Sequence, residues 1–392
     1  MDNKYEQMEV CVHDEFCGGC IHQGTPYEKQ LEDKEKEIHR LLDSKKLKID
    51  KIDSIEGSPT QYRYRNKMEY TFGDMIIDGP MTLGMHKKGH YMSIVTVDQC
   101  QLVHEDFNKI LRGTLDFAGE KGYKHYHKKS HTGLLRNLVV RLGVKTGELL
   151  VNIVTSSEPG FDEEEYVKMI KNLPLENNVV GILRTINDNI ADAVKCEELK
   201  ILDGRDYYME EIMGLKFKVS AFSFFQTNIL AVERLYREAI ELIDNFEGKT
   251  VFDLFCGTGT ITQAVALKAK KAVGVELVEE AVDAAKENAK LNGLENCEFI
   301  AGDVFKVLDN IETKPDVIIV DPPRMGIEPK ALDKIIRYGV DQIVYVSCNP
   351  KTLVENLYYM QYNGYKVKYL KPFDNFPNTK HSECIALLAR SK

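Results

Sequence analysis

The sequence has 392 residues, 43% of them hydrophobic, and a formal net charge of −9. This length is greater than that of one typical domain, so we expect two domains, each with its own core. The acidic balance gives no general attraction to phosphate, so any contact with nucleic acid must be local. No apolar run reaches about 18 residues and residues 1–10 lack the features of a signal peptide, which predicts a cytoplasmic protein with no membrane partner.

The nine cysteines are an odd number in a chain without an export signal, which argues against a disulfide framework. Cys11, Cys17 and Cys20 are separated by five and two residues, and Cys100 follows much later. Four thiols from two segments suit either zinc or a 4Fe-4S cluster. Spacing alone slightly favours zinc.

The next segments have patterns of structure rather than of chemistry. Residues 26–46 are a charged amphipathic pattern opened by Pro26, which predicts a solvated packing helix. Between about residues 60 and 220, short alternating runs are separated by Gly, Asn and Asp turns. This alternation predicts a largely antiparallel α+β domain.

Positive charge is concentrated at the start of that domain, in residues 61–70. Arg63, Arg65 and Lys67 alternate there with tyrosines, a combination that offers both phosphate contacts and stacking faces for RNA. A strand with one charged, solvent-facing side explains the same pattern. The tyrosines concerned are Tyr62, Tyr64 and Tyr70.

From Val251 onward, short β-branched runs alternate with helical stretches, which predicts a parallel sheet covered by helices. The last two strands are separated by a loop rather than by a helix, so we expect the final strand to be antiparallel. The predicted strands are 250–254, 272–276, 297–301, 316–320, 342–346, 366–370 and 384–389.

A glycine turn follows the first of these strands. Gly257 and Gly259 let the backbone turn tightly and approach a ligand at the start of a helix. The third glycine of the dinucleotide fingerprint is absent, which disfavours NAD and FAD. Glu276 ends the next strand, where a carboxylate can accept hydrogen bonds from both ribose hydroxyls, so adenosine without a diphosphate fits. An ordinary βαβ turn beside a surface glutamate is the alternative.

Further reactive side chains follow the later strands. Asp303 and Asp321 come after the third and fourth strands, and Cys348 comes after the fifth, at the same predicted edge. A thiol there is a candidate nucleophile, although a lone cysteine is more often a small buried residue. Glu383 precedes the final strand and is a candidate general base.

Five ordered segments resemble the RNA uridine C5 methyltransferase family. They are FSFFQTN (222–228), DLFCGTGT (253–260), DPPRMGI (321–327), SCNP (347–350) and HSE (381–383). The segment CVHDEFCGGC (11–20) is similar to the cluster-binding segment of the iron-sulfur-containing 23S rRNA (uracil-5-)-methyltransferase branch.

The resemblance implies a class I, Rossmann-like methyltransferase domain with a seven-stranded sheet whose last strand is antiparallel, joined to a smaller α+β domain. It implies Cys348 as the nucleophile and Glu383 as the general base. Phe224 is a candidate for stacking on a flipped base, although an FSFF run is more often core. Residues implied to hold S-adenosyl-L-methionine (SAM) or substrate are Gln226, Phe255, Gly257, Gly259, Thr260, Glu276, Asp303 and Asp321, and those implied to hold a 4Fe-4S cluster, in preference to zinc, are Cys11, Cys17, Cys20 and Cys100.

The resemblance also sets the expected domain boundaries. Residues 1–22 and 55–222 would form the central, cluster- and RNA-binding domain, and residues 23–54 and 223–392 the catalytic domain. Many relatives begin with a small β-barrel RNA-binding module, the TRAM module, whereas this chain begins almost at its first cluster cysteine. We therefore expect RNA affinity to be weaker or redistributed, and we expect a monomer.

The activity implied is SAM-dependent methylation of uridine C5 in RNA, with 23S rRNA favoured and tRNA as an alternative. An RNA cytosine C5 methyltransferase is the nearest rival, but such enzymes usually have proline-cysteine and threonine-cysteine pairs where this chain has Pro322-Pro323 and Ser347-Cys348. A non-catalytic iron-sulfur RNA-binding protein is a third reading, and the presence of Cys348 and Glu383 speaks against it.

Overall fold

The computed structural model describes residues 8–190 and 196–391; the first seven residues, on which the signal-peptide prediction partly depends, lie outside it. In the described ranges, no helix is both long and apolar enough to cross a membrane. The chain divides into two compact units. The first comprises Met1–Gly24, Thr60–Glu211 and Val219–Phe222, and the second Thr25–Pro59, Ile212–Lys218 and Ser223–Lys392.

The second unit is built on a large mixed sheet in the order β1-β16-β17-β15-β14-β11-β12-β13. β17 is antiparallel to both its neighbours, whereas the other pairs are parallel. The strands are β1 (Ile49–Ile52), β11 (Thr250–Leu254), β12 (Lys271–Glu276), β13 (Cys297–Ala301), β14 (Val317–Val320), β15 (Gln342–Ser347), β16 (Tyr365–Phe373) and β17 (Glu383–Arg390).

This topology confirms the predicted α/β class and the antiparallel last strand. The predicted number of strands was wrong, because the sheet has eight described strands rather than seven. The additional strand is β1, which pairs in parallel with β16 through Ile49 and Val367. Its four residues are mostly exposed, so it has no buried run by which a sequence pattern could identify it.

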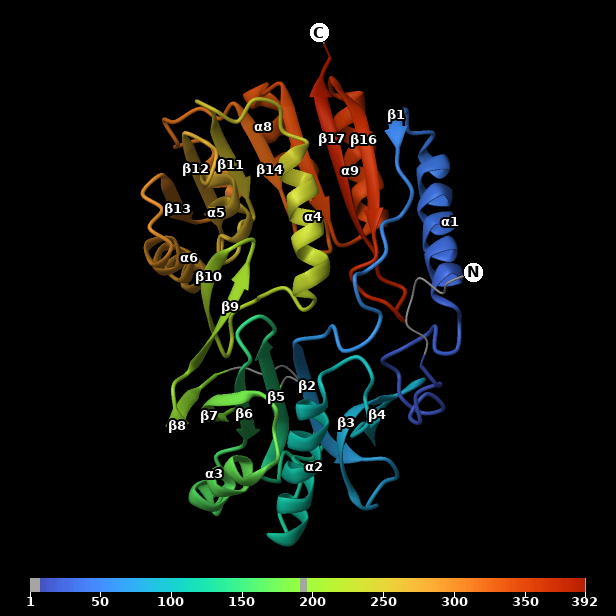
Figure 1. The fold of residues 1–392 in the computed structure, drawn as a ribbon, viewed down its shortest axis with the longest axis vertical. Coiled ribbons are helices and arrows are strands. Elements are labelled where there is room, and N and C mark those ends of the chain that lie inside the picture. The colour runs from blue at the N-terminus through green and yellow to red at the C-terminus, as the bar shows by residue number, and fades with distance from the viewer. Residues whose placement is uncertain (1–7, 191–195, 392) are drawn as a thin grey trace. The chain divides into compact units, whose positions relative to one another are not determined.

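Helices cover both faces of this sheet, and Figure 1 shows α4 on one face and α9 on the other. Asn228 caps α4 by accepting from the Ala231 amide, and Asn349 caps α9 by accepting from the Lys351 amide, as is usual for helix N-caps. The helices are α1 (Tyr27–Lys45), α4 (Ile229–Glu241), α5 (Thr260–Ala266), α6 (Glu279–Leu291), α7 (Val304–Val307), α8 (Pro329–Tyr338) and α9 (Pro350–Tyr362).

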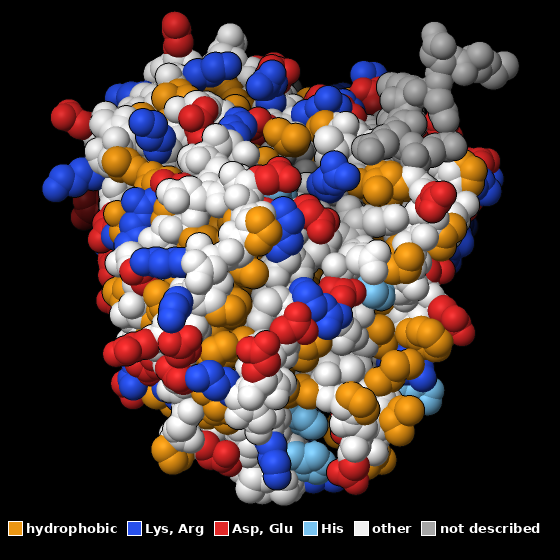
Figure 2. Space-filling view, turned by 60° about the horizontal axis from the view of Figure 1, so that its bottom comes forward, with side chains coloured by type: hydrophobic (Ala, Val, Ile, Leu, Met, Phe, Trp, Pro, Cys, Tyr) orange, Lys and Arg blue, Asp and Glu red, His pale blue; other side chains and the backbone are white. Residues whose placement is uncertain are grey.

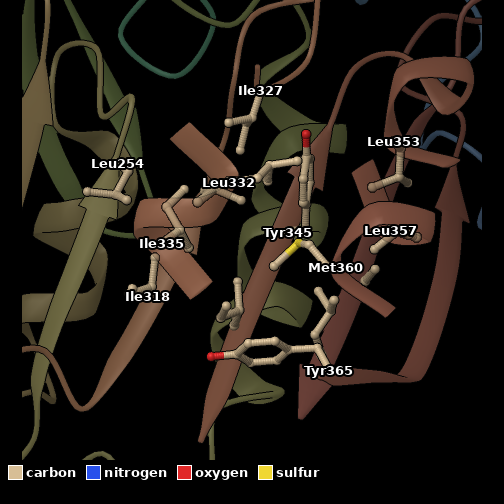
Figure 3. Close-up of a cluster of buried hydrophobic side chains, with 14 of the residues drawn as sticks. Leu254, Ile318, Ile327, Leu332, Ile335, Tyr345, Leu353, Leu357, Met360 and Tyr365 are labelled. Carbon is tan, nitrogen blue, oxygen red and sulfur yellow. The ribbon is translucent and has the colours of Figure 1, made fainter. Parts of the chain in front are cut away.

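The main core of this unit lies between the sheet and helices α1, α8 and α9. Figure 3 shows side chains from β11, β14, β15 and β16 meeting those of α8 and α9. One polar group sits inside it: the Asn356 carboxamide accepts from the Tyr345 hydroxyl at 2.7 Å and from the Ile327 amide at 2.8 Å, and it donates to the Ile327 carbonyl at 2.9 Å. Asn356 thereby anchors the end of the 321–327 loop to α9.

The first unit has a seven-stranded sheet in the order β4-β3-β2-β5-β6-β7-β8. Its pairs are antiparallel apart from β6–β7, and α2 and α3 pack together on one face, which confirms the predicted α+β character. β9 and β10 form a separate hairpin. The elements of the first unit are β2 (Lys67–Asp74), β3 (Met81–Lys87), β4 (His90–Thr96), α2 (Glu105–Glu120), β5 (Leu135–Gly143), β6 (Glu148–Thr155), α3 (Glu163–Asn172), β7 (Asn178–Ile186), β8 (Glu198–Gly204) and β9 (Tyr207–Ile212). Most of β10 (Leu215–Ser220) belongs to the second unit.

Candidate active site

The candidate site lies at one edge of the second unit's sheet. β11 pairs in register with β12 and β14, and β14 with β15, so the four parallel strands end side by side. Phe255, Glu276, Asp321 and Cys348 each stand at or directly after one of those ends. In open parallel sheets, ligands bind outside the carboxyl ends of the strands. The structure therefore brings these four predicted residues to the edge where a ligand is expected.

The glycine turn has a specific, strained backbone. Phe255 has a φ of +71°, a conformation that a bulky L residue rarely adopts, and Gly257 and Gly259 have φ values of +54° and +75°. The Glu276 carboxylate accepts a hydrogen bond from the Gly257 amide at 3.0 Å and another from the Val278 amide at 3.0 Å. Glu276 thus lies against the turn, where the ribose-binding prediction requires it.

The two glycines of this turn serve different purposes. A Cβ at Gly259 would lie 2.6 Å from the Phe299 ring and 3.0 Å from Ala285, so this residue has to be small for α5 to pack against its neighbours. A Cβ at Gly257 would meet nothing within 4 Å. The space beside Gly257 is therefore open, and a ligand can approach the backbone there.

Behind the turn lies a buried carboxyl group that the sequence interpretation did not include. Asp253 on β11 accepts from the Thr262 hydroxyl at 2.5 Å, and its other oxygen has no hydrogen-bond partner among the described residues. Burial raises the pKa of Asp253 to about 7, and the charge of Glu276 adds to the shift. Thr260, a predicted cofactor residue, is buried in the first turn of α5.

The predicted residue Asp303 follows β13, the outermost strand of this edge. β13 continues the parallel register from β12, since Glu276 is paired with Ala301. Asp303 is exposed and directly precedes the short helix α7, and its carbonyl accepts from the Lys306 and Val307 amides. It lies at the same sheet edge as Glu276, one strand further out.

Cys348 is a half-buried thiol at the end of β15. Burial raises its pKa to about 11, and the negative charges of Glu383 and Asp321 contribute to this shift, while Arg324 acts in the opposite direction. The thiol is therefore the resting form at neutral pH. The strand register places Asp321 and Glu383 at the same edge of the sheet as Cys348.

Glu383 begins β17 and is buried. Burial raises its pKa to about 7, and the positive charge of Arg324 partly opposes this shift. A carboxyl group with this pKa exchanges a proton readily near neutral pH, which suits a general base. β17 is antiparallel to β15 with Ser347 paired to Cys384, so Glu383 comes to the strand end that carries Cys348.

Arg324 follows the two prolines of the 321–327 segment, and its electrostatic importance emerges from the structure. The Arg324 carbonyl accepts from the Asn349 side chain at 2.9 Å and from the Thr352 hydroxyl at 3.3 Å. Both donors belong to the start of α9, next to Cys348. The segment after Cys348 thus holds the backbone of the residue whose charge opposes the pKa shifts of Cys348 and Glu383.

Gln226 contacts a residue that no sequence pattern had marked. Its amide donates to the hydroxyl of Tyr236 at 3.1 Å, and Tyr236 is buried on α4. Burial raises the pKa of Tyr236, and the charges of Asp321, Glu383 and Asp253 add to the effect. Tyr236 is thus the hydrogen-bond partner of Gln226, which its place on an apolar helix face does not reveal in the sequence.

The phenylalanines of the FSFF run differ in how far their rings are exposed to solvent. Phe225 is buried and packs against Phe217 with ring centroids 5.7 Å apart, so it belongs to the core, as the run as a whole suggested. Phe224 is 74% exposed, and Phe222 is partly exposed. Phe224 thus remains the most accessible aromatic ring of the run.

The four predicted metal ligands lie in the first unit as free thiols. Burial raises the pKa of Cys20 to about 11 and that of Cys100 to about 12, and neighbouring cysteines of the set contribute to both shifts. The two segments that carry them are neighbours, since the Cys11 thiol lies 4.0 Å from the Gln99 carbonyl, next to Cys100. Across the described ranges, however, no three or more His, Cys, Asp or Glu side chains are arranged to hold a metal ion.

In the predicted RNA-binding stretch, residues 61–70, part of the side chains belong to the hydrophobic core. Tyr64 and Tyr70 are buried, so they cannot offer stacking faces, and the alternative of a strand with one charged side holds only for residues 67–70, the start of β2. Arg63 is exposed, whereas Arg65 donates to the Lys67 carbonyl at 3.1 Å. On the face drawn in Figure 2, Lys and Arg side chains are interspersed with Asp and Glu rather than gathered in one basic patch.

Comparisons with known proteins match the chain to a family of RNA methyltransferases. Residues 26–391 match the model of the family described as tRNA (uracil-5-)-methyltransferase. A relative from Clostridium tetani, named as an uncharacterized RNA methyltransferase, is 53% identical over 391 residues, which are 99% of this chain and 85% of that protein. One from Clostridium acetobutylicum, similarly named, is 50% identical over 374 residues, 95% of this chain and 82% of that one.

Among solved structures, the chain is similar to the Pyrococcus abyssi tRNA (uracil-54, C5)-methyltransferase in complex with S-adenosyl-L-homocysteine. The TM-score is 0.78 and the sequence identity 26%, with 95% of this chain and 86% of that one covered. The chain therefore belongs to the tRNA (uracil-5-)-methyltransferase family of RNA methyltransferases.

Proposed function

We propose that this enzyme transfers a methyl group from SAM to C5 of a uridine in RNA, with Cys348 as the nucleophile and Glu383 as the general base. One observation carries the proposal. The pairing of β15 with β17 brings a thiol and a buried carboxyl group to the same sheet edge as the open glycine turn. A nucleophile, a base and a nucleoside site are the three components that this reaction requires.

The chemistry explains why both side chains are needed. C5 of uracil is weakly nucleophilic, so the Cys348 thiolate first adds to C6, and the electron pair of the C5–C6 double bond moves into an enolate. C5 then attacks the methyl carbon, and the carbon–sulfur bond of the sulfonium breaks, leaving S-adenosyl-L-homocysteine. Glu383 removes the C5 proton, the double bond reforms, and the C6–sulfur bond breaks to release the thiolate.

The charges around the two groups fit these steps. The thiol must lose its proton before it adds, and Arg324 favours the thiolate against the effect of burial. Glu383 must be ionised when the C5 proton leaves, and its pKa of about 7 allows this at neutral pH. Arg324 opposes both pKa shifts, so one cation favours the charged forms that the reaction uses.

SAM fits the glycine turn of the second unit. Glu276 would accept hydrogen bonds from the ribose hydroxyls, and the open backbone at Gly257 leaves room for the rest of the nucleoside. Phe255, Gly259 and Thr260 would shape that site, and Asp303 would meet the adenine amino group. The S-adenosyl-L-homocysteine bound to the Pyrococcus abyssi enzyme supports this assignment. Gln226 and Asp321 would hold cofactor or substrate.

The RNA substrate must present an unpaired base. A uridine inside a stem cannot reach a thiol at a sheet edge, so we expect it to be flipped out, with Phe224 available for stacking. The resemblance of the amino-terminal cysteine segment favours 23S rRNA. The name of the family model and the Pyrococcus abyssi structure favour tRNA as the second candidate.

We also propose a 4Fe-4S cluster on Cys11, Cys17, Cys20 and Cys100, with zinc as the alternative. Four thiols from two neighbouring segments supply the donor set of such a cluster, and they would have to move closer together to hold it. The Gly19 amide lies 3.4 Å from the Cys17 sulfur and donates to it, as amides around cluster sulfurs do. Iron and sulfide analysis of anaerobically purified protein tests this; one zinc and no iron would overturn it.

The decisive experiment for the reaction uses RNA in which uridine is replaced by 5-fluorouridine. Fluorine at C5 cannot be removed as a proton, so the adduct stalls after methyl transfer and survives denaturation. We expect mass spectrometry to locate an RNA adduct on Cys348 in the presence of SAM, and none with Cys348→Ala. Parallel 23S rRNA and tRNA samples identify the substrate. If active enzyme forms no adduct with either RNA, the covalent mechanism is overturned.

A further inference from the structure

The segment between β16 and β17 leads directly to Glu383, and a buried network holds it in shape. Asp374 begins this segment, and its Oδ1 accepts from the Phe376 amide at 3.0 Å. Asn378, near the middle, has a φ of +65°. Asp374 and Asn378 are both buried. The segment is polar, irregular and largely inaccessible, so its conformation depends on the side chains that satisfy its hydrogen bonds.

Those side chains come from helix α1, whose sequence predicts a solvated packing helix. One side of this helix is buried. Tyr27, Gln30 and Lys34 recur at three- and four-residue spacing, so they lie on the same side of the helix, and all three are buried. Ile38 and Leu42 continue this side into the main hydrophobic core. The polar residues at the start of this buried side, Tyr27, Gln30 and Lys34, contact the segment before Glu383.

Lys34 makes the central contact. Its ammonium lies 2.7 Å from Oδ1 of Asp374 and donates to the Phe376 carbonyl at 3.1 Å. Both charged side chains are almost completely shielded from water, with exposures of 4% and 0%. A buried ion pair contributes little net stability compared with apolar residues of the same size, because two charges lose their hydration. What such a pair provides is a defined geometry.

Two neighbouring contacts complete the attachment. The Tyr27 hydroxyl donates to Oδ2 of Asp374 at 2.9 Å and accepts from the Ser58 amide at 2.8 Å. The Gln30 carboxamide accepts from the Asn378 amide at 2.8 Å and donates to the Asn378 side chain at 3.2 Å. Three α1 residues thus hold the segment at Asp374, Phe376 and Asn378.

The same network reaches the other motif of the site. Asn228, two residues after Gln226, donates to the Asn375 carbonyl at 2.9 Å and to the Ser58 hydroxyl at 3.2 Å. Its Oδ1 caps α4, the helix that carries Tyr236. The loop of Gln226 and the segment before Glu383 are therefore joined through buried hydrogen bonds.

We propose that Lys34 is a positioning residue for Glu383, acting through its buried contacts with Asp374 and Phe376, and that Tyr27 and Gln30 support it. This inference rests on the proposed role of Glu383 as the base. Glu383 comes directly after the held segment, at the first position of β17. Displacing a catalytic group by about 1 Å can cost on the order of 100-fold in rate, so loosening the segment should slow proton removal.

The prediction concerns one step, which separates positioning from a general loss of folding. Lys34→Met keeps an unbranched side chain only one atom shorter and removes the charge. Methyl transfer should still occur, but the C5 proton should leave slowly, so the covalent RNA adduct should accumulate on ordinary uridine RNA and carry a labelled methyl group. Turnover should fall about 100-fold. Lys36→Met on the same helix removes an exposed ion pair with Glu32 and should behave as the unchanged enzyme.

Glu383→Gln is the reference variant. If it traps a methylated adduct and Lys34→Met does too, the inference is supported. If Glu383→Gln traps adduct but Lys34→Met turns over normally, or loses adduct and turnover together, positioning by Lys34 is overturned while the proposed function stands. If Glu383→Gln traps nothing, the base role fails and the inference with it. Should circular dichroism show Lys34→Met to be unfolded, Tyr27→Phe, which removes only a hydroxyl, decides in the same way.

Discussion

Cys348 and Glu383 are brought together by the pairing of β15 with β17, whose last register pair is Ser347 with Cys384. The next residue outward on each strand is Cys348 on one and Glu383 on the other. An antiparallel strand starts where its parallel neighbours end, so the first residue of β17 lies at the carboxyl edge of the sheet. A parallel final strand would have put residue 383 at the opposite edge, away from the thiol.

Replacing Cys348 by alanine should abolish RNA methylation and leave cofactor binding intact. The thiol is proposed to act on C6 of the base, whereas the cofactor is assigned to the glycine turn between β11 and α5. Methyl transfer to RNA with labelled SAM measures the first property, and calorimetric titration with S-adenosyl-L-homocysteine measures the second. Cys196→Ala removes an exposed cysteine and is the matched control. Residual methylation in Cys348→Ala would argue against a covalent mechanism.

Gly259→Ala should lower the free energy of unfolding by about 1 to 3 kcal/mol, because the added methyl group would lie 2.6 Å from the Phe299 ring. Gly259 also has a positive φ, which an alanine tolerates poorly. Gly248→Ala separates these causes, since Gly248 has a φ of +80° and open space around its Cβ position. Urea denaturation of both variants is the measurement. Equal losses would mean that backbone strain, not the contact with Phe299, dominates.

Phe224→Ala should weaken RNA binding without affecting folding. The ring is 74% exposed, so it contributes little to the core, and stacking of a base on an aromatic ring is worth about 1 to 3 kcal/mol. Filter binding or fluorescence anisotropy with the unmodified substrate RNA measures the affinity, and thermal unfolding measures the stability of the protein. Tyr362→Ala, which removes another exposed ring at the end of α9, is the control. Unchanged affinity in Phe224→Ala would exclude stacking by this ring.

The strands that form the candidate site could be predicted because each is a short, β-branched, buried run. Their observed ends lie close to the predicted ones, and a strand end determines which residue reaches the edge of the sheet. The structure accordingly groups Glu276, Asp321 and Cys348 at the carboxyl edge. The resemblance, rather than any periodicity, suggested Gln226.

Other parts of the site depend on long-range contacts that local patterns do not encode. Lys34 lies in a charged helical segment and is recognisable as a buried residue only through its partner Asp374, 340 positions later. Tyr236 lies on an apolar helix face and is indistinguishable from core until its hydrogen bond with Gln226 is known. β1 lacks a buried run altogether. In each case the tertiary partner, not the local sequence, defines the role.

Glu383→Gln should stabilise the folded protein at about pH 8 while abolishing turnover. The pKa of Glu383 is about 7 in the folded state, above the ordinary value of 4.5, because burial disfavours the charged form. At pH values below the ordinary pKa, the carboxyl group is protonated in both the folded and the unfolded state and does not change the free energy of unfolding. As pH rises from the ordinary value to the folded pKa and beyond, the unfolded chain ionises in water while the folded state must stay protonated or bury a charge, so stability is lost.

A neutral glutamine has no such cost, so the stability difference between the two proteins should be small near pH 5 and grow to at most about 3 kcal/mol near pH 8. Urea denaturation followed by circular dichroism at both pH values measures it. Glu241→Gln, at an exposed position on α4, should change stability by the same small amount at both. A Glu383→Gln variant whose advantage does not increase with pH would mean that Glu383 is ionised in the folded enzyme throughout this range, and its role as a base tuned to neutral pH would have to be abandoned.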